Sequence, residues 1–272
     1  MTRTGDEIKA AVQEYYGERA RQAATSCCGG ESPRERLYAG EEPRRAAWLG
    51  SLPETVASYG CGNPGAIAGL RPGEVVLDLG SGPGLDCFLA AREVGPQGRV
   101  IGLDMTPAML ELADANKARL GVTNVEFRRG EMEAMPVEDA SIDAIISNCV
   151  INLSPDKDAV FRESARVLKA DGRLHVSDIV LSRELSEAER DDLALWAGCA
   201  SGALLEADYL ARLRAAGFAE VRVDSRGPVG EKPWYSATIS AYKQTAGAAA
   251  RRTGEAIPLT ATGPAASPGQ CC

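Results

Sequence analysis

The sequence predicts an α/β fold in which a doubly wound, largely parallel sheet has helices on both faces, with an N-terminal helical arm and a small C-terminal α+β domain. Three observations predict it. Short apolar runs alternate with helical patterns through the middle of the chain, a glycine-rich loop joins the first run to the first helix, and two β-rich runs follow later. Strands that alternate with helices are joined by right-handed crossovers, which produce a parallel sheet covered on both faces.

Residues 1–72 predict a helix followed by an arm. Ile8, Val12 and Tyr16 recur at helical spacing among charged residues between positions 5 and 24, which is typical of an amphipathic helix. The segment after this helix is rich in Gly, Pro and charge, with one short helical stretch. We therefore expect an arm or lid there rather than a domain.

Residues 73–200 carry the alternating pattern and predict the main domain. The predicted strands are EVVLDL, RVIGLD, NVEFRR, SIDAIISN and RLHVSDIV. The predicted helices span residues 85–93, 107–120, 157–169 and 187–197. A proline begins the second of these helices. Proline is favoured at this position because the first N–H groups of a helix have no hydrogen-bond partner within the helix.

Residues 201–243 predict a C-terminal substrate or lid region. A helix is expected over residues 207–216, and the runs FAEVRVDS and WYSATISAYK, joined by a Gly/Pro turn, predict an antiparallel pair that closes the sheet. Residues 244–272 contain few large apolar side chains and cannot offset the entropy of ordering, so a disordered tail is expected.

Composition excludes several classes of function. The 272 residues include 30 Lys plus Arg and 38 Asp plus Glu, a net charge of −8, which argues against a nucleic-acid partner because phosphates need a clustered positive field. No apolar run approaches the roughly 18 residues of a membrane span. The first residues alternate charges instead of forming the apolar core of a signal peptide, so a cytoplasmic protein with reduced thiols is expected.

The eight cysteines are unusual beside a single histidine. No C-x-x-C pair occurs, which argues against zinc ribbons and thioredoxin-like motifs. His175 lies in a predicted strand and is expected to be packed there. Cys87, one turn into the first helix after the glycine loop, is also expected to pack against the sheet.

The glycine-rich loop predicts a nucleotide-like ligand, because it lies where a strand turns into a helix. Its notable residues are Asp78, Gly80, Ser81, Gly82 and Gly84. A carboxylate at Asp78 would repel a pyrophosphate but suits the cationic sulfonium and amino end of S-adenosylmethionine. Asp104 closes the next strand, 20 residues after Gly84 (104 − 84), where an acceptor pair would take both hydroxyls of a ribose. We therefore expect S-adenosylmethionine as the cofactor.

Three cysteines are placed so that they can meet near this ligand. Cys149 directly follows the fourth predicted strand, Cys199 lies in a small-residue loop after the fifth, and Cys61 precedes the first. Reactions on such sheets take place beyond the carboxyl ends of the strands. We therefore expect the three thiols to converge there.

At this point the sequence resembles a known family, the arsenite S-adenosylmethionine methyltransferases, which have the Rossmann-like class I methyltransferase fold. The likeness runs from about residue 15 to about residue 243, and its specific segments are YGCGNP, VLDLGSGPGLDCF, SNCVINLSPDK and AGCASGAL. The resemblance implies that Cys61, Cys149 and Cys199 bind arsenic(III). It also implies an N-terminal redox cysteine, either Cys27 or Cys28.

The same resemblance implies further cofactor contacts. The loop after the third strand would border the adenine, and the end of the fourth strand would line the methyl donor. These cofactor-binding residues would be Met105, Glu131, Met132 and Asn148.

Arsenic chemistry suits this set of residues. Soft thiolates are ligands that select trivalent arsenic. Three thiolate ligands leave the arsenic lone pair free to attack the methyl carbon. Catalysis then consists mainly of positioning the two reactants. No proton leaves the nucleophile, so no general base is needed. Because methyl transfer raises arsenic to the pentavalent state, the resemblance implies a disulfide between Cys27 or Cys28 and Cys61, with thioredoxin or glutathione as the reductant.

Two other functions remain open at this point. A class I methyltransferase acting on carbon or oxygen of a small organic acceptor would share the fold and the glycine loop. A non-catalytic, thiol-rich metalloid-binding protein is the second alternative, and the terminal pair Cys271 and Cys272 would suit metalloid capture.

Overall fold

The computed structural model describes residues 4–25, 48–57, 69–192, 195–196, 198–228 and 232–243. Its strands are β1 (Val75–Leu79), β2 (Arg99–Asp104), β3 (Val125–Arg129), β4 (Ile142–Asn148), β5 (Leu168–Leu181), β6 (Phe218–Arg226) and β7 (Trp234–Lys243). Its helices are α1 (Gly5–Thr25), α4 (Leu85–Val94), α5 (Pro107–Leu120), the short 3₁₀ helix η2 (Ile151–Leu153), α6 (Lys157–Val167), α7 (Glu187–Asp191) and α9 (Glu206–Ala215). The α/β pattern expected from the sequence is confirmed.

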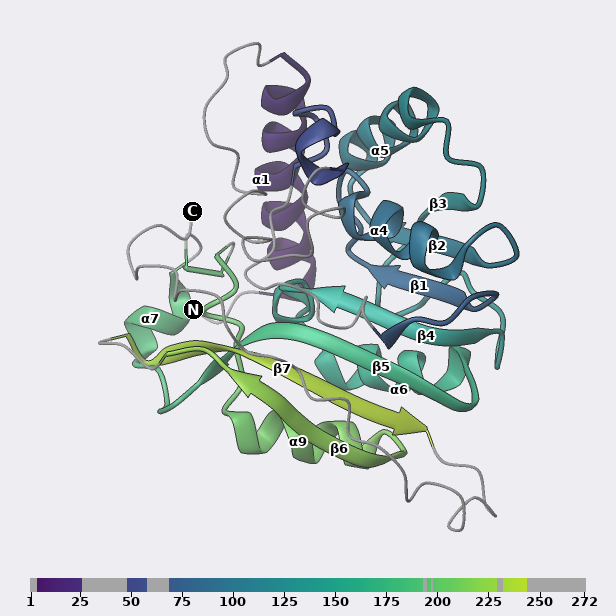
Figure 1. Cartoon of the computed structure of the whole chain (residues 1–272). Helices are drawn as coiled ribbons and strands as arrows, with labels where there is room; N and C mark the ends of the chain where they lie inside the picture. Colours follow the sequence, from purple (N-terminus) through teal and green to yellow (C-terminus); the bar gives the residue numbers. More distant parts are fainter. Residues whose placement is uncertain are drawn as a thin grey trace.

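The seven strands form one sheet in the order β3-β2-β1-β4-β5-β7-β6. The first five pair in parallel, whereas β7 runs antiparallel to both β5 and β6 (Figure 1). The chain leaves β1 toward β2 on one side and returns to β4 on the other. This reversal opens a crevice beyond the carboxyl ends of β1 and β4, where doubly wound sheets bind ligands.

Successive side chains of the strands point to opposite faces of the sheet and pack into two separate hydrophobic cores. On β1, Val76 packs with residues of α4, including Phe88, on one face of the sheet. Leu77 points to the opposite face and packs with Phe161 of α6 and Tyr209 of α9. This period of two is what a sheet covered on both faces requires.

Helix α1 lies along the end of the sheet, beside α5 (Figure 1). Lys9 contacts the carboxylates of Glu131 at 2.6 Å and Glu133 at 3.5 Å, and the Gln13 side chain donates to the carbonyl of Met105 at 3.3 Å. The N-terminal helix predicted from the apolar spacing is therefore confirmed, and it is joined to the loops that follow β2 and β3.

Two predicted helices differ in extent from the sequence pattern. The helix expected over residues 157–169 ends at Val167, because the buried Leu168 turns to extended backbone and pairs with Ile142. The helix expected over residues 187–197 is interrupted at Asp192: α7 ends at Asp191, Asp192 is extended and its side chain accepts a hydrogen bond from the Leu195 amide, and Leu195 and Trp196 are helical again.

The C-terminal region adds to the main sheet. Helix α9 packs against β6, and β6 and β7 are strands of the same sheet as β1 to β5. The boundary expected between residues 200 and 201 stays a prediction, and the tail expected at residues 244–272 lies outside the described residues.

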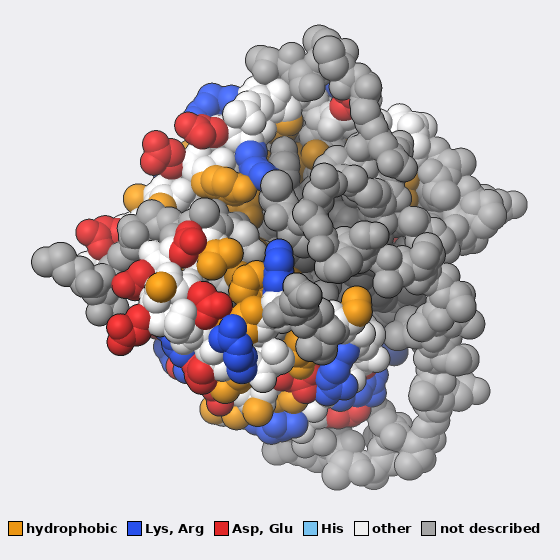
Figure 2. Space-filling view, turned by 90° about the vertical axis from the view of Figure 1, so that its left-hand side faces the viewer, with side chains coloured by type: hydrophobic (Ala, Val, Ile, Leu, Met, Phe, Trp, Pro, Cys, Tyr) orange, Lys and Arg blue, Asp and Glu red, His pale blue; other side chains and the backbone are white. Residues whose placement is uncertain are grey.

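Two further observations concern the charges on the surface and the hydrophobicity of the helices. On the face seen in Figure 2, acidic and basic side chains of the described residues are interspersed among hydrophobic ones and form no continuous basic stripe. Within the described ranges, no helix has both the length and the apolar character needed to cross a bilayer.

Candidate active site

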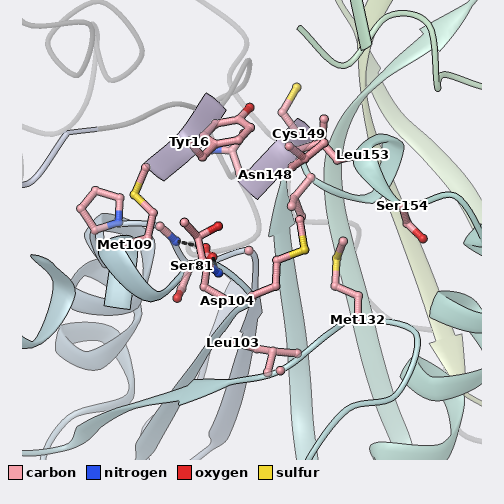
Figure 3. A pocket seen from close by; sticks show the side chains of 18 of the residues that line it. Tyr16, Ser81, Leu103, Asp104, Met109, Met132, Asn148, Cys149, Leu153 and Ser154 are labelled. Atoms are coloured by element: carbon pink, nitrogen blue, oxygen red, sulfur yellow. Dashed lines mark hydrogen bonds between the residues drawn. The ribbon is translucent and has the colours of Figure 1, made fainter. Parts of the chain in front are cut away.

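A hollow with about 930 Å³ of empty space, part of it open to solvent, lies beyond the carboxyl ends of β1, β2 and β4 (Figure 3). Its walls come from α1, the glycine loop and the segments that follow β2, β3 and β4. Residues that line it include Lys9, Val12, Tyr16, Gly80, Ser81, Gly82, Asp86, Asp104, Met105, Thr106, Met109, Met132, Glu133, Asn148, Cys149, Val150, Leu153 and Ser154.

The glycine loop needs its glycines for two reasons. Gly80, Gly82 and Gly84 have φ values of 65°, 51° and 95°, which is the left-handed region. A Cβ on Gly80 would lie 2.3 Å from a methyl carbon of Val150, and one on Gly84 would lie 2.7 Å from the Phe127 ring. Among the described residues, no atom outside the immediate chain neighbours lies within 4 Å of a Cβ built on Gly82, which lines the cavity. The loop therefore gives a ligand close access at Gly82.

Asp104 is fixed beside this loop by two backbone amides. One carboxylate oxygen accepts a hydrogen bond from Gly82 N at 2.9 Å, and the other accepts one from Thr106 N at 2.8 Å. Burial raises the pKa of the Asp104 carboxyl, although these two bonds oppose the shift. Each oxygen has a further lone pair, so the carboxylate can still accept from a ligand.

Asp78 lies behind the cavity wall and is 2% exposed. Its carboxylate accepts a hydrogen bond from the thiol of Cys87, which is also buried. Burial raises the Asp78 pKa well above its usual range, and the nearby charges of Asp86 and Asp104 add to the shift. The packing role expected for Cys87 agrees with its complete burial.

A different carboxylate reaches the cavity. Asp86, in the first turn of α4, lines the wall and accepts a hydrogen bond from the side-chain amide of Asn148 at 3.1 Å. Ser81 adds a buried hydroxyl that has no hydrogen-bond partner among the described residues. The donors and acceptors of the site therefore lie around one open space.

The two described cysteines of the predicted arsenic site are in contact. Cys149 follows β4 and lines the cavity, and its amide donates to the Ser177 carbonyl at 2.7 Å. The thiol of Cys199 donates to the Cys149 carbonyl oxygen, also at 2.7 Å. Both are buried and neither forms a disulfide. In Figure 3 the Cys149 sulfur lies at the far end of the site from Leu103.

Comparison with known proteins identifies the family. The model of the methyltransferase domain family matches residues 70–219. The arsenite methyltransferase of Aquipseudomonas alcaligenes is 38% identical over 261 residues, which are 86% of this chain and 71% of that protein. The chain belongs to the arsenite methyltransferase family. The arsenite methyltransferase of Halobacterium salinarum is 50% identical over 239 residues, which cover 81% of this chain and 60% of the relative's length.

A solved structure agrees with this membership. The crystal structure of an arsenic(III) S-adenosylmethionine methyltransferase from Chlamydomonas reinhardtii has a TM-score of 0.68 and 36% sequence identity. It covers 76% of this chain, and the chain covers 76% of it. The class I methyltransferase fold expected from the sequence is confirmed.

Most of the predicted site residues that the structure describes line the cavity of this family member. Those that line it are Gly80, Ser81, Gly82, Asp104, Met105, Met132, Asn148 and Cys149. Asp78, Gly84, Glu131 and Cys199 are not among the lining residues, although Cys199 contacts Cys149. Cys27, Cys28 and Cys61 lie outside the described residues, as do Cys271 and Cys272. Among the described residues, no three side chains of His, Cys, Asp or Glu meet as a metal site.

Sequence reasoning missed several residues of the wall. Lys9, Val12 and Tyr16 come from α1, whose amphipathic spacing was visible but did not indicate what the helix covers. No pattern in the sequence indicates Asp86 and Glu133, because the direction of each side chain depends on the rotation of a helix or loop.

His175 takes no part in the site of this family member. Its ring nitrogen Nδ1 lies 2.8 Å from the Ser240 hydroxyl of β7, and the ring packs edge-on against Tyr242. Burial lowers the His175 pKa to about 4. The packed strand histidine expected from the sequence agrees with these contacts.

Proposed function

We propose that this chain transfers methyl groups from S-adenosylmethionine to trivalent arsenic bound by the thiolates of Cys61, Cys149 and Cys199. The observation that carries the proposal is the contact between Cys149 and Cys199 at the edge of the cavity. In this contact the Cys199 thiol meets the main-chain carbonyl of Cys149, so the two residues that carry these soft ligands lie side by side, and Cys149 lines the space beside the glycine loop. Soft thiolates are the side chains that select a thiophilic centre such as arsenic(III).

The hydrogen-bonding groups around the cavity suit S-adenosylmethionine. Gly82 leaves open space at the loop, Ser81 offers a buried hydroxyl without a described partner, and the Asp104 carboxylate is held toward the same space. Asp104 would accept from the ribose hydroxyls. Met105, Met132 and Asn148 would line the rest of the cofactor, and Glu131 would lie beside the adenine loop.

Negative charge in the wall favours a cationic cofactor. The carboxylate of Asp86 lines the cavity, and Asp78 lies directly behind it. We assign the recognition of the sulfonium and amino end to the Asp86 carboxylate, because burial disfavours the charge on Asp78, which points away from the cavity toward Cys87. The cofactor, when bound, supplies an electrophilic methyl carbon.

The reaction itself needs positioning more than acid–base chemistry. The cysteine thiolates hold arsenic so that its lone pair faces the methyl carbon, and helix α1 with Tyr16 limits access of water from one side. The nucleophile has no proton to lose, so no side chain acts as a base. The arsenic lone pair would form the new As–C bond while the S–C bond of the sulfonium breaks, so that S-adenosylhomocysteine would leave with the electron pair of that bond and arsenic would become pentavalent.

The return to trivalent arsenic takes two electrons. Two cysteine thiols, Cys61 with Cys27 or Cys28, would supply them by forming a disulfide and releasing two protons. Thioredoxin or glutathione would then reduce that disulfide. Because the cycle depends on free thiols, we propose the cytoplasm as its compartment.

One experiment tests this function. Purified protein is incubated with arsenite, S-adenosylmethionine and a thiol reductant, and the arsenic species are separated and identified. Methylated arsenicals are the expected product. Arsenite that is bound but unchanged would instead indicate a sequestration protein, and neither binding nor product would point to a methyltransferase of an organic acceptor.

A further inference from the structure

A buried lysine lies between the two segments that carry the described cysteines. Lys157, the first residue of α6, is 7% exposed. Its ammonium group donates to the carbonyl of Ser154 at 2.8 Å and to that of Asn152 at 3.2 Å. Both carbonyls belong to the segment that begins at Cys149 and passes through η2.

The same ammonium group faces the segment of Cys199. It lies 5.7 Å from the centre of the Trp196 ring, within the range of a cation–π contact. The indole N–H of Trp196 donates to the Leu153 carbonyl at 3.4 Å. Lys157 and Trp196 together therefore contact three successive carbonyls, those of residues 152, 153 and 154.

Trp196 is also hydrogen-bonded to Cys199, the residue that carries the second thiol. The Trp196 carbonyl accepts a hydrogen bond from the Cys199 amide at 2.8 Å, and Cys199 has a φ of 64°. Cys149, with a φ of 60°, is likewise in the left-handed region. A non-glycine residue adopts this conformation only when its surroundings enforce it.

The chemistry of lysine explains its presence here. An ammonium group has three donors and can bond two carbonyls while it faces an aromatic ring, which an apolar side chain of similar length cannot do. Burial disfavours the charge and lowers the Lys157 pKa to about 8, with Asp178, Arg212, Cys199 and Glu133 as the other charged groups that act on it.

We propose that Lys157 is a positioning residue that fixes the Cys149 segment against the Cys199 turn and so holds the two sulfurs at the spacing that a trivalent arsenical needs. This inference rests on the proposed function. It assigns no contact between Lys157 and arsenic, and the residue acts only through the two backbone segments.

The test uses the full chain with Cys27, Cys28, Cys61, Cys271 and Cys272 replaced by Ser, which leaves the three described cysteines. Phenylarsenite, which bridges two thiols, is the probe, and the bound arsenical is counted by mass spectrometry of the intact protein. Affinity for S-adenosylhomocysteine is measured by calorimetry on the same samples. The matched control is Lys169→Met, since Lys169 forms an ion pair with Asp143 on the protein surface.

In this background Lys157→Met should raise the Kd for phenylarsenite by about tenfold or more, while the Kd for S-adenosylhomocysteine stays within about twofold. Lys169→Met should change neither affinity. If Lys157→Met does not fold, Trp196→Phe takes its place, with an expected rise of about threefold for the arsenical alone.

Three outcomes are informative. A phenylarsenite Kd that is unchanged in Lys157→Met overturns the positioning role, and so does an equal loss of both affinities, which would indicate general loosening of the fold. If the chain with Lys157 intact fails to bind phenylarsenite, the proposed arsenic site itself is wrong.

Discussion

The thiol of Cys199 donates a hydrogen bond to the backbone carbonyl of Cys149, across 2.7 Å and 50 residues of chain. This bond orders the Cys199 sulfur against the turn that follows β4. Both residues have a left-handed backbone, so their sulfurs are directed by main-chain geometry that costs about 1–3 kcal/mol per residue and that the surrounding packing must enforce.

Replacing either cysteine should therefore abolish the proposed chemistry. Cys149→Ser and Cys199→Ser are expected to eliminate methylation of both arsenite and monomethylarsenite, because a hydroxyl is a hard ligand for a soft centre. Arsenic speciation measures the products, and S-adenosylhomocysteine calorimetry verifies that the cofactor site persists. Cys87→Ser, which changes a thiol outside the arsenic site, should retain arsenic binding. Full activity in either of the first two variants would contradict the three-thiolate site.

The open space at Gly82 allows a prediction about the cofactor, because a Cβ at this position meets no atom of the part of the chain that the structure describes and would occupy ligand space. Gly82→Ala should raise the Kd for S-adenosylhomocysteine by about tenfold. Gly73 provides a matched control, since it has a φ of 85° and equally open surroundings but does not line the cavity. Gly73→Ala should carry a similar backbone cost, about 1–2 kcal/mol, with no change in affinity. Equal affinities for the two variants would show that the cofactor does not approach Gly82.

The close packing around Gly202 predicts that a larger residue at this position would destabilise the loop near the thiols. A Cβ on Gly202 would lie 2.1 Å from the Asn152 carbonyl oxygen, so the segment after Cys149 would have to move. We expect Gly202→Ala to lower the free energy of unfolding by about 1–3 kcal/mol and to weaken arsenical binding. Gly50→Ala is the control, because a Cβ there meets no described residue within 4 Å. Urea unfolding of both variants provides the measurement, and equal stabilities would contradict the close packing of this loop.

His175 predicts a specific dependence of stability on pH. Its pKa of about 4 in the folded chain lies below the ordinary 6.5. Between these two values the unfolded chain binds a proton that the folded chain does not, so the free energy of unfolding falls as the pH drops through this window. The contribution is at most about 3 kcal/mol.

Replacing the histidine with a residue that does not titrate should remove this contribution. Urea unfolding at pH 7 and at pH 4.5 should show a smaller acid-induced loss for His175→Asn than for the unmodified chain. Asn can keep a hydrogen bond with Ser240, which makes it the matched substitution. Identical losses in both proteins would mean that His175 titrates normally when folded.

The sequence predicted the parts of the site that depend on where strands end. Asp104 and the glycine loop lie at such ends, and in a parallel sheet those ends meet at one edge. The convergence of Cys149 with Cys199 followed from the same reasoning, because each comes after a strand that pairs with its neighbour in parallel.

The parts that escaped prediction depend on side-chain direction. Asp78 and Asp86 are both acidic and close to the loop, but Asp78 points into the protein toward Cys87, and Asp86 is turned to the cavity by the rotation of α4. The early end of α7 depends on Asp192, whose side chain bonds the Leu195 amide in place of the backbone carbonyl that a continuous helix would use. Apolar periodicity does not record either effect.

The position of β7 has a consequence for how the chain acquires its structure. This strand comes last among the described elements, yet it lies inside the sheet, with β5 on one side and β6 on the other. During synthesis, β6 therefore has no neighbour in the sheet until residues 234–243 leave the ribosome. Until then the β5 edge is unpaired and open to association with other chains. Since β5 lies next to β4, which Cys149 directly follows, a nascent chain released before Lys243 would leave the first thiol segment one strand away from an open edge.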